Sequence, residues 1–389
     1  MPFNKLFSIV IPCFHLLLAC KSSNYNDYKR NQNSCEITST KDEVISIIKK
    51  VNNTWQLNHP KPGNAFWNVS VYHTGNMAAY EVTKNQNYLN YSLSWANKNQ
   101  WMGAKSTDKA NWKSSYGETD DHVLFGDWQT CFQTYIDLYN FTGKKDETKI
   151  ARAREVMEYE MSTPKNNYWW WVDAMYMAMP VMTKLYKVTG NKLYLEKLED
   201  YLEYSNAIMW DDEAKLYYRD AKYIYPKHKS LNGKKDFWSR GDGWIFAGYA
   251  KIIQDLPENA QYKQKYIEHF QNMAKALSEA QQKEGYWSRS ILDPEAAPGP
   301  ETSGTALFCY GFLWGINNGV LNKDTYLPVV KKSWDYLTNI ALQENETIGY
   351  VQPIGEKAIP SQVIDKNSSS DFGTGVFLLA ASEMCRYLD

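Results

Sequence analysis

A weak internal repeat restricts the fold of this chain more than any other feature of its sequence. After about residue 40, each unit contains an apolar segment of helical length, a short turn and a more polar segment of similar length. The turns lie about 50 to 65 residues apart, which is the length of a two-helix hairpin with its connecting loop. Most of them place glycine or asparagine just after an apolar run, which is a helix stop signal. The turns are 82–85, 141–144, 188–191, 255–258 and 318–321.

The repeat predicts six helical hairpins. One helix of each pair is apolar on nearly all sides, so we expect it to be buried, whereas its partner carries lysine and glutamate stripes that suit a solvent-facing surface. No stretch has the sustained alternation of a β-strand, although 216–220 could form a small hairpin. Six inner and six outer helices in series describe an all-α (α/α)6 barrel, a single domain over residues 41–389. The inner helices are expected near 67–82, 127–140, 173–188, 242–255, 303–318 and 372–387, and the outer ones near 41–57, 87–100, 147–161, 193–209, 260–282 and 324–341.

All inner helices of such a barrel run in the same direction, so their N-termini meet at one end. Five of the expected helix starts carry a carboxylate: Asp127, Asp173, Asp242, Glu301 and Asp371. Each of these could simply cap its helix. Together they converge on one funnel, where the partial positive charge of helix N-termini favours an anionic ligand such as a uronate.

Four consecutive aromatic residues, Tyr168 to Trp171, run into Asp173 and an apolar helix. The chain contains 29 Tyr and 15 Trp, an aromatic content of 15%. This surplus fits a large core, and it also fits a carbohydrate site because aromatic faces stack on sugar rings. A carboxyl group beside such a wall loses its water, which raises its pKa and allows it to carry a proton. The alternative interpretation of Asp173 is a helix cap beside core tryptophans.

The first 19 residues predict a bacterial signal peptide. Lys5 supplies a basic start, and the apolar run over 6–19 is too short to span a bilayer comfortably. The run ends in Leu-Leu-Ala-Cys, which resembles a lipobox and implies cleavage before Cys20 and lipidation of its thiol. Residues 20–40 are rich in Ser, Asn and Lys and predict a tether. We therefore expect a protein of the cell envelope, on the periplasmic side or the outer-membrane surface, that touches the membrane through its lipid alone.

Charge and cysteine spacing exclude two other classes of protein. The formal net charge is −1, so the chain lacks the basic surface that nucleic-acid binding requires. Cys131, Cys309 and Cys385 lie in apolar helical runs without the close spacing of metal ligands. We expect these three cysteines to be small buried side chains rather than a metal site.

Three motifs resemble one known group of enzymes. They are residues 171–177 (Trp-Val-Asp-Ala-Met-Tyr-Met), residues 240–244 (Arg-Gly-Asp-Gly-Trp), and Asp127 followed by 133–139. At these residues the chain resembles the unsaturated rhamnogalacturonyl hydrolases of glycoside hydrolase family 105 and, more distantly, the unsaturated glucuronyl hydrolases. The resemblance covers most of the chain after about residue 40. It implies an (α/α)6 barrel that needs no metal or other cofactor.

The resemblance also implies a reaction. Such enzymes remove a 4,5-unsaturated uronic acid from the non-reducing end of an oligosaccharide left by a polysaccharide lyase. An acid protonates C4 of the enol ether, water adds at C5, and the resulting hemiketal opens the ring and releases the remaining sugar. Asp173 matches the general acid/base, and Asp127 matches a second carboxylate that holds a hydroxyl group or positions water. Asp120 and Asp121 compete with Asp127 for the second role.

Residues that would hold the substrate follow from the same resemblance. Trp171 and Trp244 match aromatic residues that flank the sugar. Arg240 matches an arginine whose planar fork suits the uronate carboxylate. The predicted substrate-binding set is Trp171, Arg240, Trp244, Asp242, Trp170 and His122.

Two histidines that the resemblance leads us to expect are absent, and residues 162–165 and 218–220 occupy their places. His122 and His228 are the candidates to replace them, although a lone histidine in a loop is more often simply solvated. The absence of these two histidines affects the prediction of which sugar occupies the next subsite more than it affects the predicted reaction.

Two other functions are compatible with the sequence. An inverting glycosidase on the same barrel would use Asp127 as base and Asp173 as acid. A surface glycan-binding lipoprotein without catalysis would keep the aromatic funnel and the anchor, but it would need no proton donor. Unsaturated sugar ends derived from pectin, from ulvan-like polysaccharides or from glycosaminoglycans all fit the sequence. The sequence predicts no oligomeric state.

Overall fold

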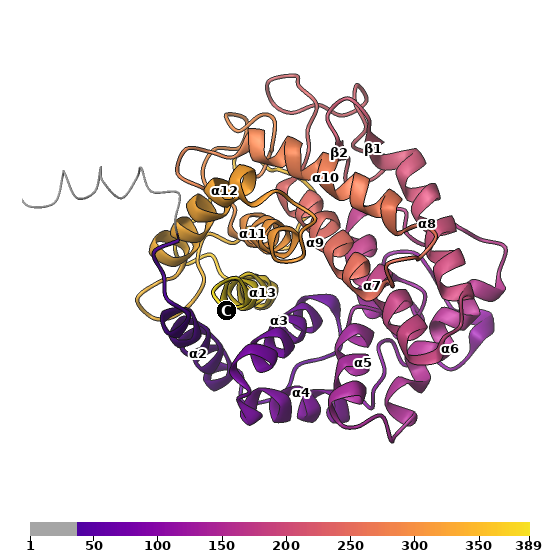
Figure 1. Cartoon of the computed structure of the whole chain (residues 1–389). Helices are drawn as coiled ribbons and strands as arrows, with labels where there is room; N and C mark the ends of the chain where they lie inside the picture. The colour runs from indigo at the N-terminus through magenta and orange to yellow at the C-terminus, as the bar shows by residue number, and fades with distance from the viewer. Residues whose placement is uncertain (1–36) are drawn as a thin grey trace, which may run out of the picture. The chain divides into compact units, whose positions relative to one another are not determined.

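The computed structural model describes residues 37–389. The predicted signal peptide, Cys20 and most of the predicted tether lie outside the described residues. Within residues 37–389, twelve α-helices alternate between an inner and an outer ring (Figure 1). No helix in this part of the chain combines the length and the hydropathy that crossing a bilayer requires.

The inner ring closes on itself because the last inner helix packs against the first, as Figure 1 shows. Each outer helix precedes an inner helix in the chain and covers the outside of the ring. This arrangement is the (α/α)6 barrel that the repeat predicts. The inner helices are α3 (Trp67–Thr83), α5 (Cys131–Phe141), α7 (Val172–Thr189), α9 (Ser239–Asp255), α11 (Thr302–Asn317) and α13 (Asp371–Tyr387). The outer helices are α2 (Lys41–Asn58), α4 (Gln86–Lys98), α6 (Thr148–Ser162), α8 (Leu193–Met209), α10 (Lys263–Ala280) and α12 (Lys323–Tyr336).

Closure of the ring depends on a glycine contact between its two ends. A Cβ atom at Gly75 of α3 would lie 2.0 Å from the carbonyl oxygen of Gly375 of α13. A Cβ atom at Gly375 would in turn lie 2.5 Å from the carbonyl oxygen of Val71. No side chain fits at these distances, so glycine at both positions allows the two backbones to pack directly against each other.

The observed elements differ from the predicted ones mainly at their ends. Helix α5 begins at Cys131 instead of residue 127, and Asp127 lies in the 3₁₀ turn η2 (Gly126–Trp128). The outer helix expected over 324–341 is divided in two: α12 ends at Tyr336, and the remaining residues form the π-helical turn η3 (Leu337–Ala341). The small hairpin expected near residue 216 is confirmed, since β1 (Trp210–Asp211) pairs with β2 (Leu216–Tyr217) in antiparallel fashion. Cys131, Cys309 and Cys385 are free and buried, as expected.

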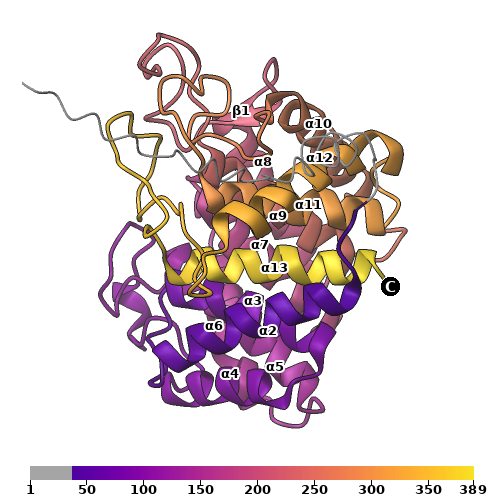
Figure 2. The ribbon, with the colours of Figure 1, turned by 90° about the vertical axis from the view of Figure 1, so that its left-hand side faces the viewer.

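Long loops gather at the N-terminal end of the inner helices. They span residues 99–130, 210–238, 281–301 and 342–370, and each leads from an outer helix to the next inner one. In Figure 2, α13 runs across the barrel to the C-terminus, and long loops lie at its opposite end. Isolated bridges tie these loops to the barrel, as between Trp171 and Asp220. The loops therefore build a structured rim at one end of the ring.

Candidate active site

A cavity of about 460 Å³ opens at this loop-bearing end of the barrel. Its wall comes from the start of α3, the loop before α5, the start of α7 and two loop segments, 219–222 and 354–356. These segments are far apart in the sequence, and the parallel inner helices bring them to one place. The aromatic side chains in the wall include Trp67, Phe125, Trp170 and Trp171.

Asp173 lies in this wall as the second residue of α7, and only 8% of its surface is exposed. Its Oδ2 atom is 3.4 Å from Nε of Arg219. Neither atom has a hydrogen-bond partner among the described residues. The backbone fixes this juxtaposition, because the N–H of Val172 donates to the carbonyl oxygen of Arg219 at 3.0 Å. Asp173 therefore presents a buried carboxyl oxygen that is not committed to a structural hydrogen bond.

Asp127 supplies the second carboxyl group of the cavity from the turn η2 and is 6% exposed. Burial raises its pKa well above the usual carboxyl range, the like charge of Asp173 adds to this, and the Arg219 cation opposes it. Burial also raises the pKa of Asp173, against the opposing charges of Arg219 and Arg240. The cavity thus holds two desolvated carboxyl groups that keep protons to higher pH than exposed ones do.

An aromatic wall stands beside the two carboxyl groups. The ring of Trp171 stacks on Phe125 with centroids 4.6 Å apart and an interplanar angle of 20°. Trp170 packs against Trp171 at 4.5 Å, and the guanidinium carbon of Arg219 lies 6.0 Å from the Trp170 ring centroid. The structure therefore places two of the three predicted tryptophans, Trp170 and Trp171, in the cavity wall, where aromatic residues can flank a sugar ring.

The structure also brings charged residues to the cavity that the sequence did not single out. Nη1 of Arg219 lies 2.6 Å from Asp220 and 3.5 Å from Glu356, and Lys222 lies 3.1 Å from Glu356. Arg219 lies in the segment where the family resemblance led us to expect a histidine. The absence of that histidine was the only feature of the sequence that could have pointed to Arg219 as a site residue. Glu118 and Glu356 come from loops whose fold no local pattern predicts.

Arg240 does not lie in the cavity wall, so its predicted contact with the uronate is corrected. The side chain is fully buried and donates to the carbonyl oxygens of Gln352 at 2.6 Å and Pro353 at 2.9 Å. Its guanidinium carbon lies 4.6 Å from the ring centroid of Trp238 and 4.9 Å from that of Phe372. Because the next residues, 354–356, line the cavity, Arg240 holds that loop in place instead of gripping the sugar.

Three other predicted residues also lie outside the wall. Asp242 is buried in α9 and accepts a hydrogen bond from the N–H of Tyr217 at 2.8 Å. Trp244 is a core residue whose ring packs at 4.7 Å from Tyr176. His122 lies within hydrogen-bond distance of Thr119, at 2.9 Å.

The remaining alternatives are also absent from the wall. Asp121 pairs with Lys113, the backbone N–H of Lys105 donates to Asp120, and His228 lies 3.0 Å from Asp236. Of Asp120, Asp121 and Asp127, the three aspartates that the sequence offered for the second role, only Asp127 lines the cavity. Within residues 37–389, no three His, Cys, Asp or Glu side chains are grouped to hold a metal ion.

Comparison with known proteins matches the whole barrel to one family. The model of glycosyl hydrolase family 88 matches residues 33–388. A protein of Formosa agariphila named unsaturated 3S-rhamnoglycuronyl hydrolase is 30% identical over 344 residues, which are 85% of this chain and 88% of that protein. A solved glycosyl hydrolase family 88 structure from Bacteroides vulgatus is 60% identical with a TM-score of 0.88, over 90% of this chain and 100% of that one. A solved structure described as a polysaccharide lyase is 63% identical with a TM-score of 0.88, over 90% of this chain and 98% of that one.

The buried position of Arg240 generates a prediction about stability. Arg240→Met leaves the buried carbonyl group of Gln352 and the partly buried one of Pro353 without their donor, so we expect it to lower the free energy of unfolding by about 3 kcal/mol. Urea unfolding followed by circular dichroism measures this loss. Lys222→Met is the matched control, since that exposed cation lies in the cavity wall and its removal should change stability by less than about 0.5 kcal/mol. Equal stability of the two variants would contradict the structural role of Arg240.

Proposed function

This chain belongs to glycosyl hydrolase family 88, and from that membership we propose that it removes a 4,5-unsaturated uronic acid from the non-reducing end of oligosaccharides. It is a glycosidase, and its substrate is the kind of end that a polysaccharide lyase leaves. The observation that carries the proposal is the pair of desolvated carboxyl groups, Asp173 and Asp127, in an aromatic cavity next to a cation.

Hydration of the double bond needs a proton and a water molecule. A protonated carboxyl group gives its proton to C4, the oxygen of water bonds to C5, which neutralises the charge that develops there, and the proton that this water loses passes to a carboxylate of the cavity. C5 then carries both a hydroxyl group and the ring oxygen, so the bond between C5 and the ring oxygen breaks and C5 becomes a ketone. The ring oxygen takes the hydroxyl proton and leaves a hemiacetal at C1, which becomes an aldehyde when the glycosidic oxygen leaves with a proton and the remaining sugar. No carboxylate has to attack the anomeric carbon, in contrast to a retaining glycosidase.

Asp173 is the proposed acid because it lies in the wall beside Trp171 and its Oδ2 atom makes no hydrogen bond with a described residue. Burial supports this role because it raises the pKa of Asp173 even though the residue begins a helix and faces Arg219. Asp127 is then the proposed second carboxyl group that orients a hydroxyl or the attacking water. Arg219 replaces Arg240 as the proposed partner of the uronate carboxylate, since its guanidinium reaches the cavity.

A second candidate reaction follows from the 63% identical structure that is described as a polysaccharide lyase. A lyase eliminates the group at C4 after a base removes the proton at C5, so it creates the double bond that the proposed hydrolase consumes. The match to glycosyl hydrolase family 88 and the similarity to an unsaturated 3S-rhamnoglycuronyl hydrolase favour hydration over elimination as the primary proposal.

A panel of lyase-generated oligosaccharides tests the reaction type. The purified protein should lower the ultraviolet absorbance of the unsaturated ends, and mass spectrometry should show addition of one water with release of the shortened sugar. Asp173→Asn should reduce turnover by at least about a hundredfold while binding is retained, because the amide cannot supply the proton.

Each rival function gives a different result in this panel. Rising absorbance with saturated polyuronates would indicate the lyase, and turnover of saturated glycosides would indicate the inverting glycosidase. Binding of every unsaturated end without turnover would indicate a glycan-binding protein. Near-normal activity of the Asp173→Asn variant would remove Asp173 from the acid role.

The assignment of Arg219 predicts changes in both affinity and pH dependence. Its charge lowers the pKa of Asp173, so Arg219→Gln should raise that pKa and extend activity to higher pH, because the acid then keeps its proton longer. The same change should raise KM by about tenfold through loss of the carboxylate contact. Initial rates across a pH series measure both effects. Lys222→Gln is the control, and the same basic limb in both variants would contradict the proposed role.

We further propose that lipid on Cys20 anchors the enzyme in the cell envelope, with residues 20–40 as a tether. The support is the lipobox-like end of the first 20 residues. In a bacterial host, the wild-type protein should fractionate with membranes and incorporate a labelled fatty acid, and Cys20→Ala should do neither. Membrane association that persists in this variant would contradict the anchor.

A further inference from the structure

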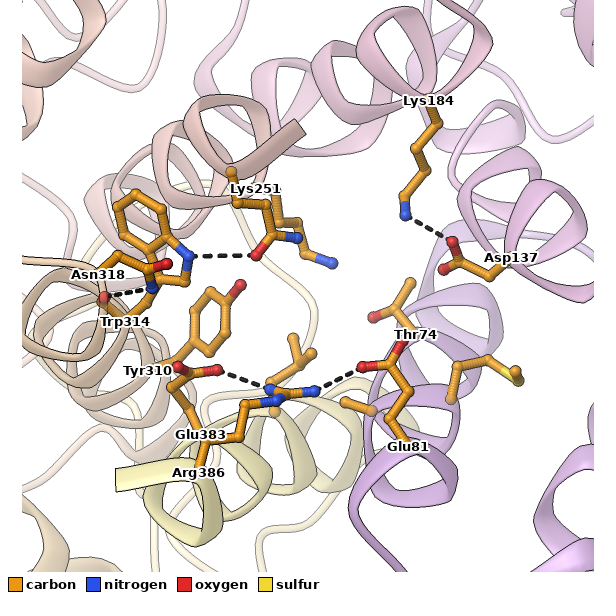
Figure 3. A pocket seen from close by; sticks show the side chains of 14 residues that line it. Thr74, Glu81, Asp137, Lys184, Lys251, Tyr310, Trp314, Asn318, Glu383 and Arg386 are labelled. Carbon is orange, nitrogen blue, oxygen red and sulfur yellow. Dashed lines mark hydrogen bonds and ion pairs between the residues drawn. The ribbon is translucent and has the colours of Figure 1, made fainter. Parts of the chain in front are cut away.

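A second cavity, of about 240 Å³, lies at the other end of the ring. All of its lining residues belong to the later parts of inner helices or follow them directly, whereas the active-site cavity is lined by helix starts. Figure 3 shows this cavity with side chains that point inward from several inner helices. It shares no lining residue with the active-site cavity, so it is a separate space in the same barrel.

Most charges in this cavity are paired. Arg386 lies 2.6 Å from Glu81 and 2.7 Å from Glu383, and Lys184 lies 2.5 Å from Asp137, as the dashed lines in Figure 3 show. Glu81 is 43% exposed at its side chain, whereas that of Glu383 is 4% exposed. The cavity therefore reaches solvent beside Glu81.

Lys251 of α9 is the exception among these charges. Only 8% of the surface of Lys251 is exposed, and its ammonium group has no hydrogen bond or ion pair with any described residue. Its Nζ atom lies over the ring of Tyr176, 5.5 Å from the ring centroid. Burial lowers the pKa of Lys251 to about 8, and the neighbouring charge of Lys184 adds to this.

The helix dipoles do not account for this lysine. The negative ends of six helices converge here, and Arg386 is a last-turn cation that complements its own helix. Lys251 is not in the last turn of α9. Lys251 is mostly buried and makes no ion pair, so its ammonium loses part of its hydration, although the charges of Asp137, Asp255 and Glu81 favour its charged form. A ligand with a negative charge would replace the lost hydration with a direct contact.

The rest of the lining restricts what that ligand can be. Asn318, Gln254 and Thr74 offer polar groups, and the carboxylates of Glu81 and Asp137 have further lone pairs to accept hydrogen bonds. Such carboxylates would repel a simple anion but accept from hydroxyl groups. Tyr310 and Trp314 add aromatic rings to the same wall, and the volume suits one small ring rather than a chain of sugars.

From this combination we propose that the second cavity binds a small acidic sugar, with its carboxylate on Lys251 and its hydroxyl groups on the surrounding carboxylates and amides. The choice of a hexuronate as probe rests on the proposed function, since the enzyme releases an acidic sugar. The occupancy of the site does not depend on turnover.

Sodium glucuronate is the probe for the test. A crystal structure of the wild-type protein with glucuronate should show the sugar in this cavity, with its carboxylate within hydrogen-bond distance of the Lys251 ammonium. Isothermal titration should show that Lys251→Met weakens this binding by at least about tenfold, the loss of one charged hydrogen bond. Turnover of unsaturated oligosaccharides should be unchanged in this variant. Lys187→Met, which removes an exposed cation of α7, is the matched control and should bind like the wild type.

Three results would overturn the inference. They are absence of glucuronate from the cavity in the crystal, unchanged affinity in Lys251→Met, and acetate binding as tight as glucuronate binding. The crystal experiment needs no variant, so it stands even if Lys251→Met does not fold. Glucuronate in the cavity of a protein that hydrates no unsaturated end would refute the proposed function alone. Normal turnover with an empty cavity would refute this inference alone.

Discussion

The closed ring of parallel inner helices is the constraint on which the rest of this structure depends. Because every inner helix runs in the same direction, one end of the ring collects N-termini and long loops, and the other collects C-termini and short turns. The direct backbone contact between Gly75 and Gly375 allows the first and last helices to close the ring. Two chemically different cavities follow from this arrangement without any additional domain.

At the loop-bearing end, two opposing effects set the protonation of Asp173. Burial removes water from the carboxyl group and raises its pKa, while Arg219 at 3.4 Å favours the charged form. Hydration of an enol ether needs both states in turn, since the acid gives up a proton and must then recover one. A buried carboxyl group beside an incompletely paired cation suits this cycle better than either an exposed acid or a tightly bonded ion pair.

The sequence predicted the barrel well because its evidence is periodic and local. Apolar runs, polar partners and turns fall along the chain in the order that the helices take, and helix starts located Asp173 and Trp171 in the cavity wall. Arg240 was misplaced because its motif gives a position on α9 but not the loop that its side chain meets. Arg219 was not assigned to the site because a pairing between residues far apart, the bridge of Trp171 with Asp220, brings it there. No local pattern encodes such a pairing.

Three buried or nearly buried cations show how the partners of a side chain distinguish its roles. Arg240 has two carbonyl acceptors and two aromatic rings, so its charge is satisfied within the protein and holds a loop. Arg219 pairs with carboxylates but also faces the cavity, so a substrate carboxylate can join its partners. Lys251 has no such partner among the described residues. Since desolvating a charge costs free energy in every case, the cation with the fewest internal contacts has the most to gain from a ligand.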